Sequence, residues 1–498
     1  MKDSSNTPSR QATFLGADLS TTALSVGVRG ANGDEDFVSI EMVGATCWHD
    51  QPGFHLEQLP LMMSAALEML QQRAWHFGVP GSLSFSVRQH DMVLLDRTHQ
   101  PLLPSLSWEC HVAQQEVVEL EQLGIDQEVG PIAPRFILPK LLWTLRQESY
   151  LADRIEHVVT TGDFIAARLT GQLALSASDA LSNALLDQSS KKLAKSAIAK
   201  TPIRPSWFPD VVASGSVVGQ VGPVDDDDQA WVKVRDLMPG WSVSAGLGDN
   251  HASAVGCGLA DPRTIVISAG SSGTIVRACA PSAKLAGHAN CFEFYDDRLL
   301  LFMLADCAIW YNRFLEEWLH GSRDHAALNE AACGVEVSRI QQVTQNVQNG
   351  VFCEQYPEGF RDLDWPEQLA STQFSIALEL LRLVGDMLGE VQDTDAAIER
   401  CVLTGGLCQS PWFRWVVHAG LSQLVPAAKV RVSARNDKLA FQSATYGALI
   451  NAMIQGDYAS LPRTIEQLCP QRDCDVADSR MANALATLVA HYLKSPRS

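Results

Sequence analysis

The sequence predicts an α/β protein made of two large domains of related architecture, and three observations lead to this expectation. The chain has 498 residues, which is too many for one ordinary hydrophobic core. An apolar strand, a small hydroxyl-bearing turn and a second apolar strand occur twice, in the first thirty residues and again just after residue 263. Segments with the helical spacing of apolar residues follow each copy.

The two strand-turn-strand segments are expected to form hairpins. Strands are expected at 14–18 and 24–29, and again at 264–268 and 275–278. In both copies the turn between the strands is rich in small residues. We therefore expect one copy per half of the chain, with domains at 1–258 and 259–498.

The remaining elements are expected from periodicity and turn signals. Helices are expected at 59–77, 113–124, 139–148, 188–200, 251–258, 309–319 and 374–391, and from Pro411 onward. Buried strands are expected at 241–247 and 401–404. The acidic segment 224–229 is expected to be an exposed turn rather than a metal site.

Composition excludes several classes of function. Apolar residues make up 46% and charged residues 19%, as in a globular enzyme. The formal charge of −19 argues against nucleic acid and against an anionic membrane, because both require clustered Lys and Arg. With neither a secretion signal nor a long apolar run, the chain is expected in the cytoplasm. Twelve scattered cysteines without a CxxC pair predict reduced thiols, and no His and Cys cluster has the spacing of a metal site.

Both hairpin turns are candidate phosphate sites. The first holds Asp18, whose carboxylate could orient a hydrated magnesium ion, and the donors Ser20, Thr21 and Thr22. A hydroxyl turn that only closes the hairpin is the alternative. The second turn offers small residues and two glycines that allow close approach of a ligand. Its residues are Gly270, Ser271, Ser272, Gly273 and Thr274.

Two further motifs follow buried strands. In Gly248-Asp249-Asn250, Asp249 could cap a helix or accept a proton from a hydroxyl that attacks a phosphate. The helix dipole and capping are expected to keep its pKa low. Gly405 and Gly406 could let a planar adenine lie against the backbone, or could simply form a turn.

The order of these motifs resembles the FGGY family of carbohydrate kinases, and the xylulose kinases within it most of all. The similarity extends over roughly residues 14–455. Further matching segments are Phe136 to Trp143, Gly162 to Gly171, Ser178 to Asn183 and Ala444 to Ala448.

The resemblance implies two ribonuclease-H-like domains of the actin and hexokinase superfamily, with an interdomain cleft that closes on ATP and sugar. It implies that Asp18 and Asp249 position Mg²⁺ and that Asp249 is the catalytic base. The second turn would face the phosphates, and Gly405 with Gly406 the adenine. The residues implied in sugar binding are Gln89, His90, Trp108, Asp249 and Asn250.

One departure concerns the acceptor. Where the family commonly has Trp-x-Asp-x-Arg, this chain reads Trp108-Glu109-Cys110-His111-Val112, which removes a carboxylate and a guanidinium from the expected pocket. We expect an ATP-dependent kinase for a ketose, most of all a pentulose such as xylulose. The alternatives are a sugar- or nucleotide-binding protein without turnover and a kinase for a heptulose or an alditol. A homodimer is left open, and a dinucleotide-binding oxidoreductase is disfavoured because Gly-x-Gly-x-x-Gly does not follow the first strand.

Overall fold

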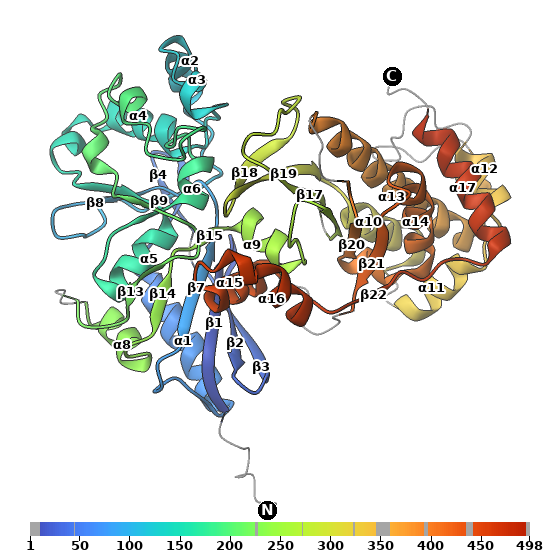
Figure 1. The fold of residues 1–498 in the computed structure, drawn as a ribbon, viewed down its shortest axis with the longest axis horizontal. Coiled ribbons are helices and arrows are strands. Elements are labelled where there is room, and N and C mark those ends of the chain that lie inside the picture. Colours follow the sequence, from blue (N-terminus) through green and yellow to red (C-terminus); the bar gives the residue numbers. More distant parts are fainter. Residues whose placement is uncertain are drawn as a thin grey trace, which may run out of the picture. The chain divides into compact units, whose positions relative to one another are not determined.

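A computed structural model of the chain describes residues 10–43, 45–224, 228–270, 272–321, 324–344, 359–392, 397–434 and 442–494 (Figure 1). By internal contacts the chain divides into two compact units. The first holds Met1–Gly256, Phe292–Asp296 and Asp437–Thr464, and the second holds Cys257–Cys291, Asp297–Asn436 and Ile465–Ser498. The expected boundary after residue 258 lies close to the first division, and the unit division also returns residues 437–464 to the first unit.

The first unit is built on a mixed sheet in the order β13-β14-β7-β1-β2-β3. Its strands are β1 (Arg10–Leu19), β2 (Ala23–Gly30), β3 (Glu35–Glu41), β7 (Ser82–Val87), β13 (Val217–Gln220) and β14 (Ser242–Ser244), with β6 (Trp75–His76) and β15 (Leu247–Gly248) beside β1 and β7. β1 runs antiparallel to β2 and parallel to β7. The smaller strands are β4 (Ala45–Trp48), β5 (Gln51–Phe54), β8 (Val93–Leu95), β9 (Ser105–Leu106), β10 (His157–Val159), β11 (Leu175–Ser176) and β12 (Val211–Val212).

Helices pack against this sheet and form a second layer of the first unit. They are α1 (Gln58–Gln72), α2 (Gln114–Gln122), α3 (Asp126–Val129), α4 (Ile137–Gln147), α5 (Thr161–Thr170), α6 (Ala177–Ser182), α7 (Lys195–Ile198), α8 (Gln229–Leu237), α9 (Asp249–Gly256) and α15 (Ser443–Ile454). α15 packs against α9 at two glycines: a Cβ on Gly256 would lie 1.9 Å from the Ser443 carbonyl oxygen, and one on Gly447 1.8 Å from that of Ala252. The Ala- and Gly-rich stretch near residue 445 is therefore explained by backbone contact between these two helices.

The second unit repeats the same sheet order. Its sheet runs β18-β19-β17-β16-β20-β21-β22. The strands are β16 (Thr264–Ala269), β17 (Gly273–Cys279), β18 (Asn290–Phe294), β19 (Asp297–Leu304), β20 (Arg400–Thr404), β21 (Lys429–Ser433) and β22 (Gln471–Asp473). Its helices are α10 (Ala308–Leu319), α11 (His325–Cys333), α12 (Val337–Thr344), α13 (Trp365–Glu390), α14 (Pro411–Leu424), α16 (Leu461–Leu468, which begins in the first unit) and α17 (Ser479–Leu493).

The two sheets share one topology, which confirms the expected duplication. In each, a hairpin's first strand lies parallel to a later strand: β1 to β7, and β16 to β20. A third parallel strand follows at the far side, β14 and β21 respectively. Each unit has its own hydrophobic core around its sheet. The carboxyl ends of the parallel strands therefore meet at one edge in each unit, where α/β proteins place their ligands.

Two expected helices are corrected by the structure. The helix expected at 59–77 ends at Gln72, because the chain turns through Ala74 at a φ of 67° and then forms β6 beside β1. The helix expected at 188–200 is reduced to α7, because the Asp187 carboxylate accepts hydrogen bonds from the backbone of Ser189 and Ser190 and closes a turn instead. Of the acidic segment, residues 225–227 lie outside the described residues, and Asp228 caps α8.

Among the described residues, every cysteine is a free thiol, as expected. None of the helices in the described ranges has the length and apolar character needed to cross a membrane.

Candidate active site

The candidate site of the first unit is the edge where β1, β7 and β15 end. β7 lies between the other two strands and runs parallel to both, with Ser86 opposite Asp18 on one side and opposite Leu247 on the other. Three chain segments therefore leave the sheet together: the turn after Asp18, the segment 88–91 and the start of α9 at Asp249. The sequence separates Asp18 from Asp249 by 231 residues, and parallel pairing brings these segments to one place.

Asp249 is the first residue of α9 and stays partly exposed. Its Oδ1 accepts a hydrogen bond from the backbone N–H of Asn250 at 2.8 Å, and the backbone N–H of Gln89 also donates to the carboxylate. Two amides from two segments thus fix the orientation of this side chain. A fixed carboxylate at a sheet edge is suited to accept a proton from a bound hydroxyl.

The pKa of Asp249 corrects the sequence-based expectation. Surrounding protein atoms raise it from 3.8 to about 7, and the neighbouring charges of Asp18 and Asp91 add to the rise. The two amide hydrogen bonds act in the opposite direction and do not compensate. The expected low pKa was wrong because loss of water and like charges outweigh the helix N-terminus. A carboxylate that titrates near neutral pH is typical of a general base.

Asp18 lies within the same electrostatic neighbourhood. It is 8% exposed and accepts a hydrogen bond from Ser86 Oγ at 2.7 Å. Burial raises its pKa to about 6, against the lowering effects of the Ser86 hydrogen bond and the Arg88 charge. The carboxylates of Asp18 and Asp249 therefore repel each other when both are ionised, and the Arg88 charge does not fully offset the effect of burial.

Gln89 and Asn250 are joined directly, since Asn250 Nδ2 donates to Gln89 Oε1 at 2.7 Å. Gln89 lies against Gly248, where an added Cβ would be 2.4 Å from Gln89 Nε2. That Nε2 group is buried and has no hydrogen-bond partner among the described residues. A free donor next to Asp249 is available to a ligand oxygen.

His90 is held in one orientation by its neighbours. Its backbone has a φ of 71°, its ring stacks on Phe136 with centroids 4.8 Å apart, and its Nδ1 lies 3.2 Å from Asn183 Oδ1. Burial, followed by the positive charges of Arg135 and Lys140, lowers the pKa of His90 to about 3. The imidazole is therefore neutral, and donation from Nδ1–H to Asn183 leaves Nε2 as a hydrogen-bond acceptor.

Lys140 stabilises this sheet edge through hydrogen bonds to the backbone, a role that the sequence analysis did not assign to it. Its side chain is fully buried, and its Nζ donates to the backbone carbonyls of His90, Leu106 and Ser107, the last two at 3.1 Å. All three ammonium protons are used. Burial lowers the pKa of Lys140 to about 8. The residue ties the segment after β7 to the segment 105–109.

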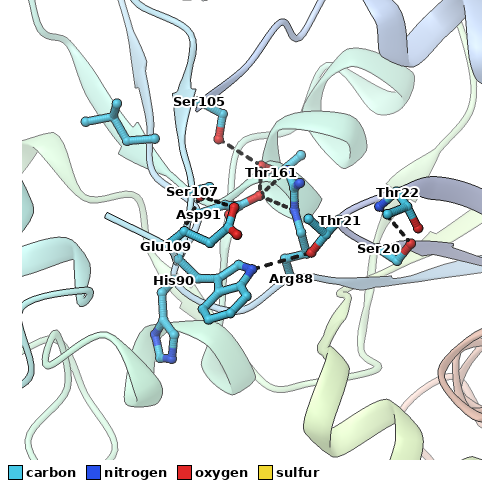
Figure 2. Close-up of polar contacts among 12 residues, drawn as sticks. Ser20, Thr21, Thr22, Arg88, His90, Asp91, Ser105, Ser107, Glu109 and Thr161 are labelled. Carbon is cyan, nitrogen blue, oxygen red and sulfur yellow. Dashed lines mark hydrogen bonds and ion pairs between the residues drawn. The ribbon is translucent and has the colours of Figure 1, made fainter. Parts of the chain in front are cut away.

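Arg88 and Asp91 form a buried ion pair on either side of Gln89 and His90. Arg88 Nη2 lies 2.7 Å from Asp91 Oδ2, and the guanidinium covers the Phe54 ring at 5.2 Å. Figure 2 shows Asp91 in a row with Thr161 and Ser105, while the His90 ring extends away from this row. The backbone N–H of Trp108 also donates to Asp91. A guanidinium and a carboxylate therefore stand beside the 108–112 segment, although residues 110 and 112 supply neither.

Trp108 and Glu109 extend the site toward the first turn. Trp108 is 39% exposed, and its indole N–H lies 3.5 Å from Thr21 Oγ1. Glu109 and Arg88 line a pocket of about 560 Å³. The other lining residues are Thr21, Thr22, Ala23, Ser39, Glu41, Met42, Pro52, Gly53, Phe54 and Ser107. His111 is exposed.

The three hydroxyl side chains of the first turn differ in their hydrogen bonding. Ser20 Oγ accepts from the backbone N–H of Thr22 and Ala23 and donates to the Ala23 carbonyl. This is the turn-closing arrangement that the sequence left as an alternative. Thr21 and Thr22 are exposed at the tip, so their side chains and not that of Ser20 remain open to a ligand.

The equivalent edge of the second unit is made of backbone. β16 and β20 end together, with Ser268 opposite Thr404. Gly405 has a φ of 96°, and a Cβ there would lie 2.5 Å from the Ala269 carbonyl oxygen. A Cβ on Gly406 would meet nothing within 4 Å, whereas one on Gly273 would lie 2.6 Å from Leu380 Cδ2. Gly405 is thus required by its backbone contact and its φ, a Cβ at Gly273 would displace the Leu380 side chain, and Gly406 leaves open space.

The remaining residues of this second turn differ in accessibility. The Gly270 amide donates to the Ser272 carbonyl at 3.2 Å, and the Gly270 carbonyl accepts from Ala308 at the start of α10. Ser272 and Thr274 are partly exposed. Ser271 lies outside the described residues.

The carboxylates of Asp18 and Asp249 fit a magnesium ion. Mg²⁺ is bound through one or two carboxylates together with water and phosphate oxygens, and the raised pKa of both groups indicates negative charge that lacks a counterion. Within the described ranges no group of three or more His, Cys, Asp or Glu residues could hold a metal by itself. An ion held by these two carboxylates would take its other ligands from water or from a substrate.

Comparison with known proteins shows which proteins the chain is similar to. Residues 14–256 match the N-terminal domain of the FGGY family of carbohydrate kinases. A xylulose kinase of Klebsiella pneumoniae is 28% identical over 271 residues, 52% of this chain and 53% of that protein. The chain thus aligns with about half the length of the curated relatives it matches.

Solved structures match over nearly the whole chain and show the fold. A ligand-bound xylulose kinase from Lactobacillus acidophilus superposes with a TM-score of 0.74 at 16% identity, covering 97% of both chains. A gluconate kinase from the same organism gives 0.75 at 16% identity, again over 97% of both chains. The chain therefore has the same fold as these two solved structures over nearly its whole length.

Proposed function

Because residues 14–256 belong to the FGGY family of carbohydrate kinases, we propose that the chain transfers the γ-phosphate of MgATP to a hydroxyl group of a small sugar. Asp249 is the general base in this proposal. The observation that carries it is the convergence of Asp18, the segment 88–91 and Asp249 at the ends of three parallel strands. The curated relatives are named xylulose kinases, which supports a ketose acceptor.

The proton step follows from the surroundings of Asp249. The acceptor hydroxyl gives its proton to the carboxylate as its oxygen forms a bond to the γ-phosphorus, and the bond from that phosphorus to the ADP oxygen breaks. The amides of Gln89 and Asn250 hold the carboxylate in place during this step. A pKa of about 7 lets Asp249 receive the proton and release it afterwards near neutral pH.

Two other groups would orient the acceptor. Gln89 Nε2 is a free donor and His90 Nε2 an acceptor, so together they recognise a carbonyl or ether oxygen and a hydroxyl on one sugar. Trp108 offers an exposed ring face for the carbon skeleton. This donor and acceptor pair supports a pentulose such as xylulose as the substrate to test first.

Magnesium and the nucleotide would be held by different edges. Asp18 and Asp249 would hold Mg²⁺ together with phosphate oxygens, and the ion would neutralise phosphate charge. The turn 270–274 and the open space at Gly406 would receive the phosphates and the adenine. The Thr21 and Thr22 side chains are exposed donors at the first turn. Transfer requires the γ-phosphate to reach the hydroxyl beside Asp249.

One observation favours a second acceptor class. The carboxylate and guanidinium near Trp108 come from Asp91 and Arg88 and not from residues 110 and 112. A changed arrangement of charges changes the hydroxyl pattern that fits. A heptulose or an alditol is therefore the second candidate, and a binding protein without turnover is the third.

An acceptor panel with matched variants tests the proposal. ADP release is measured with pentuloses, hexuloses, heptuloses, alditols and gluconate, for the wild type, for Asp249→Asn and for Asp228→Asn. The base variant should lose roughly 10²–10⁴-fold in kcat, whereas Asp228, the cap of α8, should matter little. Absence of acceptor-stimulated turnover in the whole panel, or full activity of Asp249→Asn, rejects the kinase. Acceptor binding by calorimetry without ADP release identifies a binding protein.

A further inference from the structure

Among the buried acidic residues that the proposed reaction leaves without a role is Glu293 of β18. Its side chain is 2% exposed and belongs to residues 292–296, which pack as part of the first unit although β18 pairs in the sheet of the second. Burying a carboxylate is costly unless it is paired and hydrogen bonded. Glu293 meets this condition, because its Oε2 lies 3.0 Å from His251 Nδ1 and accepts from Ser214 Oγ at 2.9 Å.

These partners lead to the residues on either side of Asp249. His251 lies two positions after Asp249 in α9 and is fully buried. Ser178 Oγ accepts from the backbone N–H of Gly248, immediately before Asp249, at 3.0 Å. The same oxygen lies 3.2 Å from His251 Nδ1. The first turn of α9 is thus held before and after the proposed base.

The network closes through one more hydroxyl. The backbone N–H of Ser178 donates to Ser214 Oγ at 3.1 Å, and that hydroxyl in turn donates to Glu293. Of the groups in the network, Glu293 alone accepts from both branches, through Ser214 and through His251. Its removal would leave the His251 Nδ1–H and the Ser214 hydroxyl without this common acceptor in a site that water does not reach.

We propose that Glu293 is a positioning residue for Asp249, acting through His251 and through the Ser214–Ser178 branch. The proposal rests on the function proposed above for Asp249. It predicts that the carboxylate of a distant strand fixes the place of the base, through the contacts with His251 and Ser214. Small displacements of a reacting group lower the rate strongly, because a misplacement of about 1 Å can cost roughly 10²-fold.

The aromatic neighbours of His251 provide a matched control. Tyr295 lies in the same segment, with its ring 4.5 Å from that of His251, and its hydroxyl donates to Asn451 Oδ1 at 3.3 Å. Tyr295→Phe removes a buried hydroxyl from the segment and leaves the contact between Glu293 and His251 in place. It therefore measures the general cost of disturbing residues 292–296.

The experiment compares Glu293→Ala, Glu293→Gln and Tyr295→Phe with the wild-type chain. Turnover is measured from pH 5 to pH 9, and the Asp249 carboxyl is titrated by ¹³C NMR with Asp249→Asn for assignment. Glu293→Ala should lower kcat by roughly 10–100-fold, leave both KM values within about twofold and shift the Asp249 titration. Glu293→Gln, which keeps an acceptor oxygen, should recover most of the loss, and Tyr295→Phe should behave as wild type.

The outcomes separate this proposal from the kinase assignment. Should the wild type lack acceptor-stimulated turnover, the proposed function fails, and the NMR titration still decides whether Glu293 governs the carboxyl of Asp249. The positioning role is rejected if folded Glu293→Ala keeps the wild-type titration and kcat. It is equally rejected if Tyr295→Phe shifts both by the same amount, since any disturbance of the segment would then suffice.

Discussion

The two sheet edges have the same strand order and opposite chemistry. At the first edge, β1, β7 and β15 end in charged and hydrogen-bonding side chains, with Asp18 and Asp249 at its centre. At the second edge, β16 and β20 end in glycine and backbone groups, and Gly405 approaches the Ala269 carbonyl where no side chain fits. A duplicated fold thus provides one edge of ionisable side chains, where we propose proton transfer, and one edge with glycines, where we propose that the nucleotide binds.

This comparison predicts opposite responses to mutation. Removing a functional side chain from the first edge should affect catalysis strongly and leave the fold intact or more stable. At the second edge, substitutions that add side-chain atoms should lower stability, because few side-chain contacts can be lost there by removing atoms. Each of the following experiments tests one side of this contrast.

The largest effect is expected for Asp18→Asn. Turnover should fall by roughly 10²–10³-fold, because the charge that would meet magnesium is lost. The free energy of unfolding of this variant should instead increase. The folded pKa of Asp18 is about 6, above the ordinary 3.8, so the carboxylate penalises the fold as pH rises through this range and fully so above it. The variant should gain on the order of 2 kcal/mol at pH 8 and nothing at pH 3.

Thermal melts of both proteins at the two pH values, alongside ADP release, measure this prediction. Ser86→Ala is the matched control, since it removes the hydrogen bond to Asp18 and keeps the charge. Equal melting curves for Asp18→Asn and the wild type at pH 8 would show that the ionised Asp18 carboxylate does not destabilise the fold.

The second largest effect is the pH dependence of turnover. Asp249 must be ionised to accept a proton, and its pKa is about 7. Below that value kcat/KM should fall about tenfold per pH unit, and more steeply below about pH 6, where Asp18 also takes up a proton. His90 cannot cause this decline, because its pKa is about 3. A rate profile that stays flat down to pH 5 would contradict the raised pKa.

The second edge is tested by adjacent glycines. Gly405→Ala would place a Cβ 2.5 Å from the Ala269 oxygen at a φ of 96°, so it should lose about 2 kcal/mol or more of unfolding free energy. Gly406→Ala meets nothing within 4 Å and should stay within about 0.5 kcal/mol of wild type. If adenine lies there, the variant should raise the KM for ATP by about tenfold. An unchanged KM would remove adenine from this position.

How far the sequence predicted these edges depends on the kind of information each one needs. Local patterns predicted both hairpins and the strand before Gly405, because alternating apolar residues and small-residue turns are local signals. Motif order predicted Asp18 and Asp249 as candidate site residues. The helix expected at 188–200 failed because Asp187 closes a turn in place of a helix, a competition that composition does not reveal.

The supporting groups could not be predicted in the same way. Lys140 was recognised only as part of a motif, and its three carbonyl partners come from segments 33 to 50 residues away. The raised pKa of Asp249 depends first on burial and then on the charges of Asp18 and Asp91, all of which arise only from tertiary structure. Arg88 and Asp91 gave a signal that could have been used, since two opposite charges follow directly after the fully buried strand β7.

The smallest effect separates turn geometry from ligand binding within the first edge. Ser20→Ala should cost about 1 kcal/mol of unfolding free energy, because the hydroxyl accepts two backbone N–H groups and donates to one carbonyl within the turn. Its KM for ATP should change less than about threefold, since that hydroxyl is already engaged. Thr22→Ala is the matched control, because Thr22 is exposed at the tip. It should leave stability unchanged and raise the KM for ATP. Denaturant titration and ATP saturation curves measure both quantities. The reverse pattern, with the larger KM change in Ser20→Ala, would show that the turn opens on binding and that its serine, not its threonines, contacts phosphate.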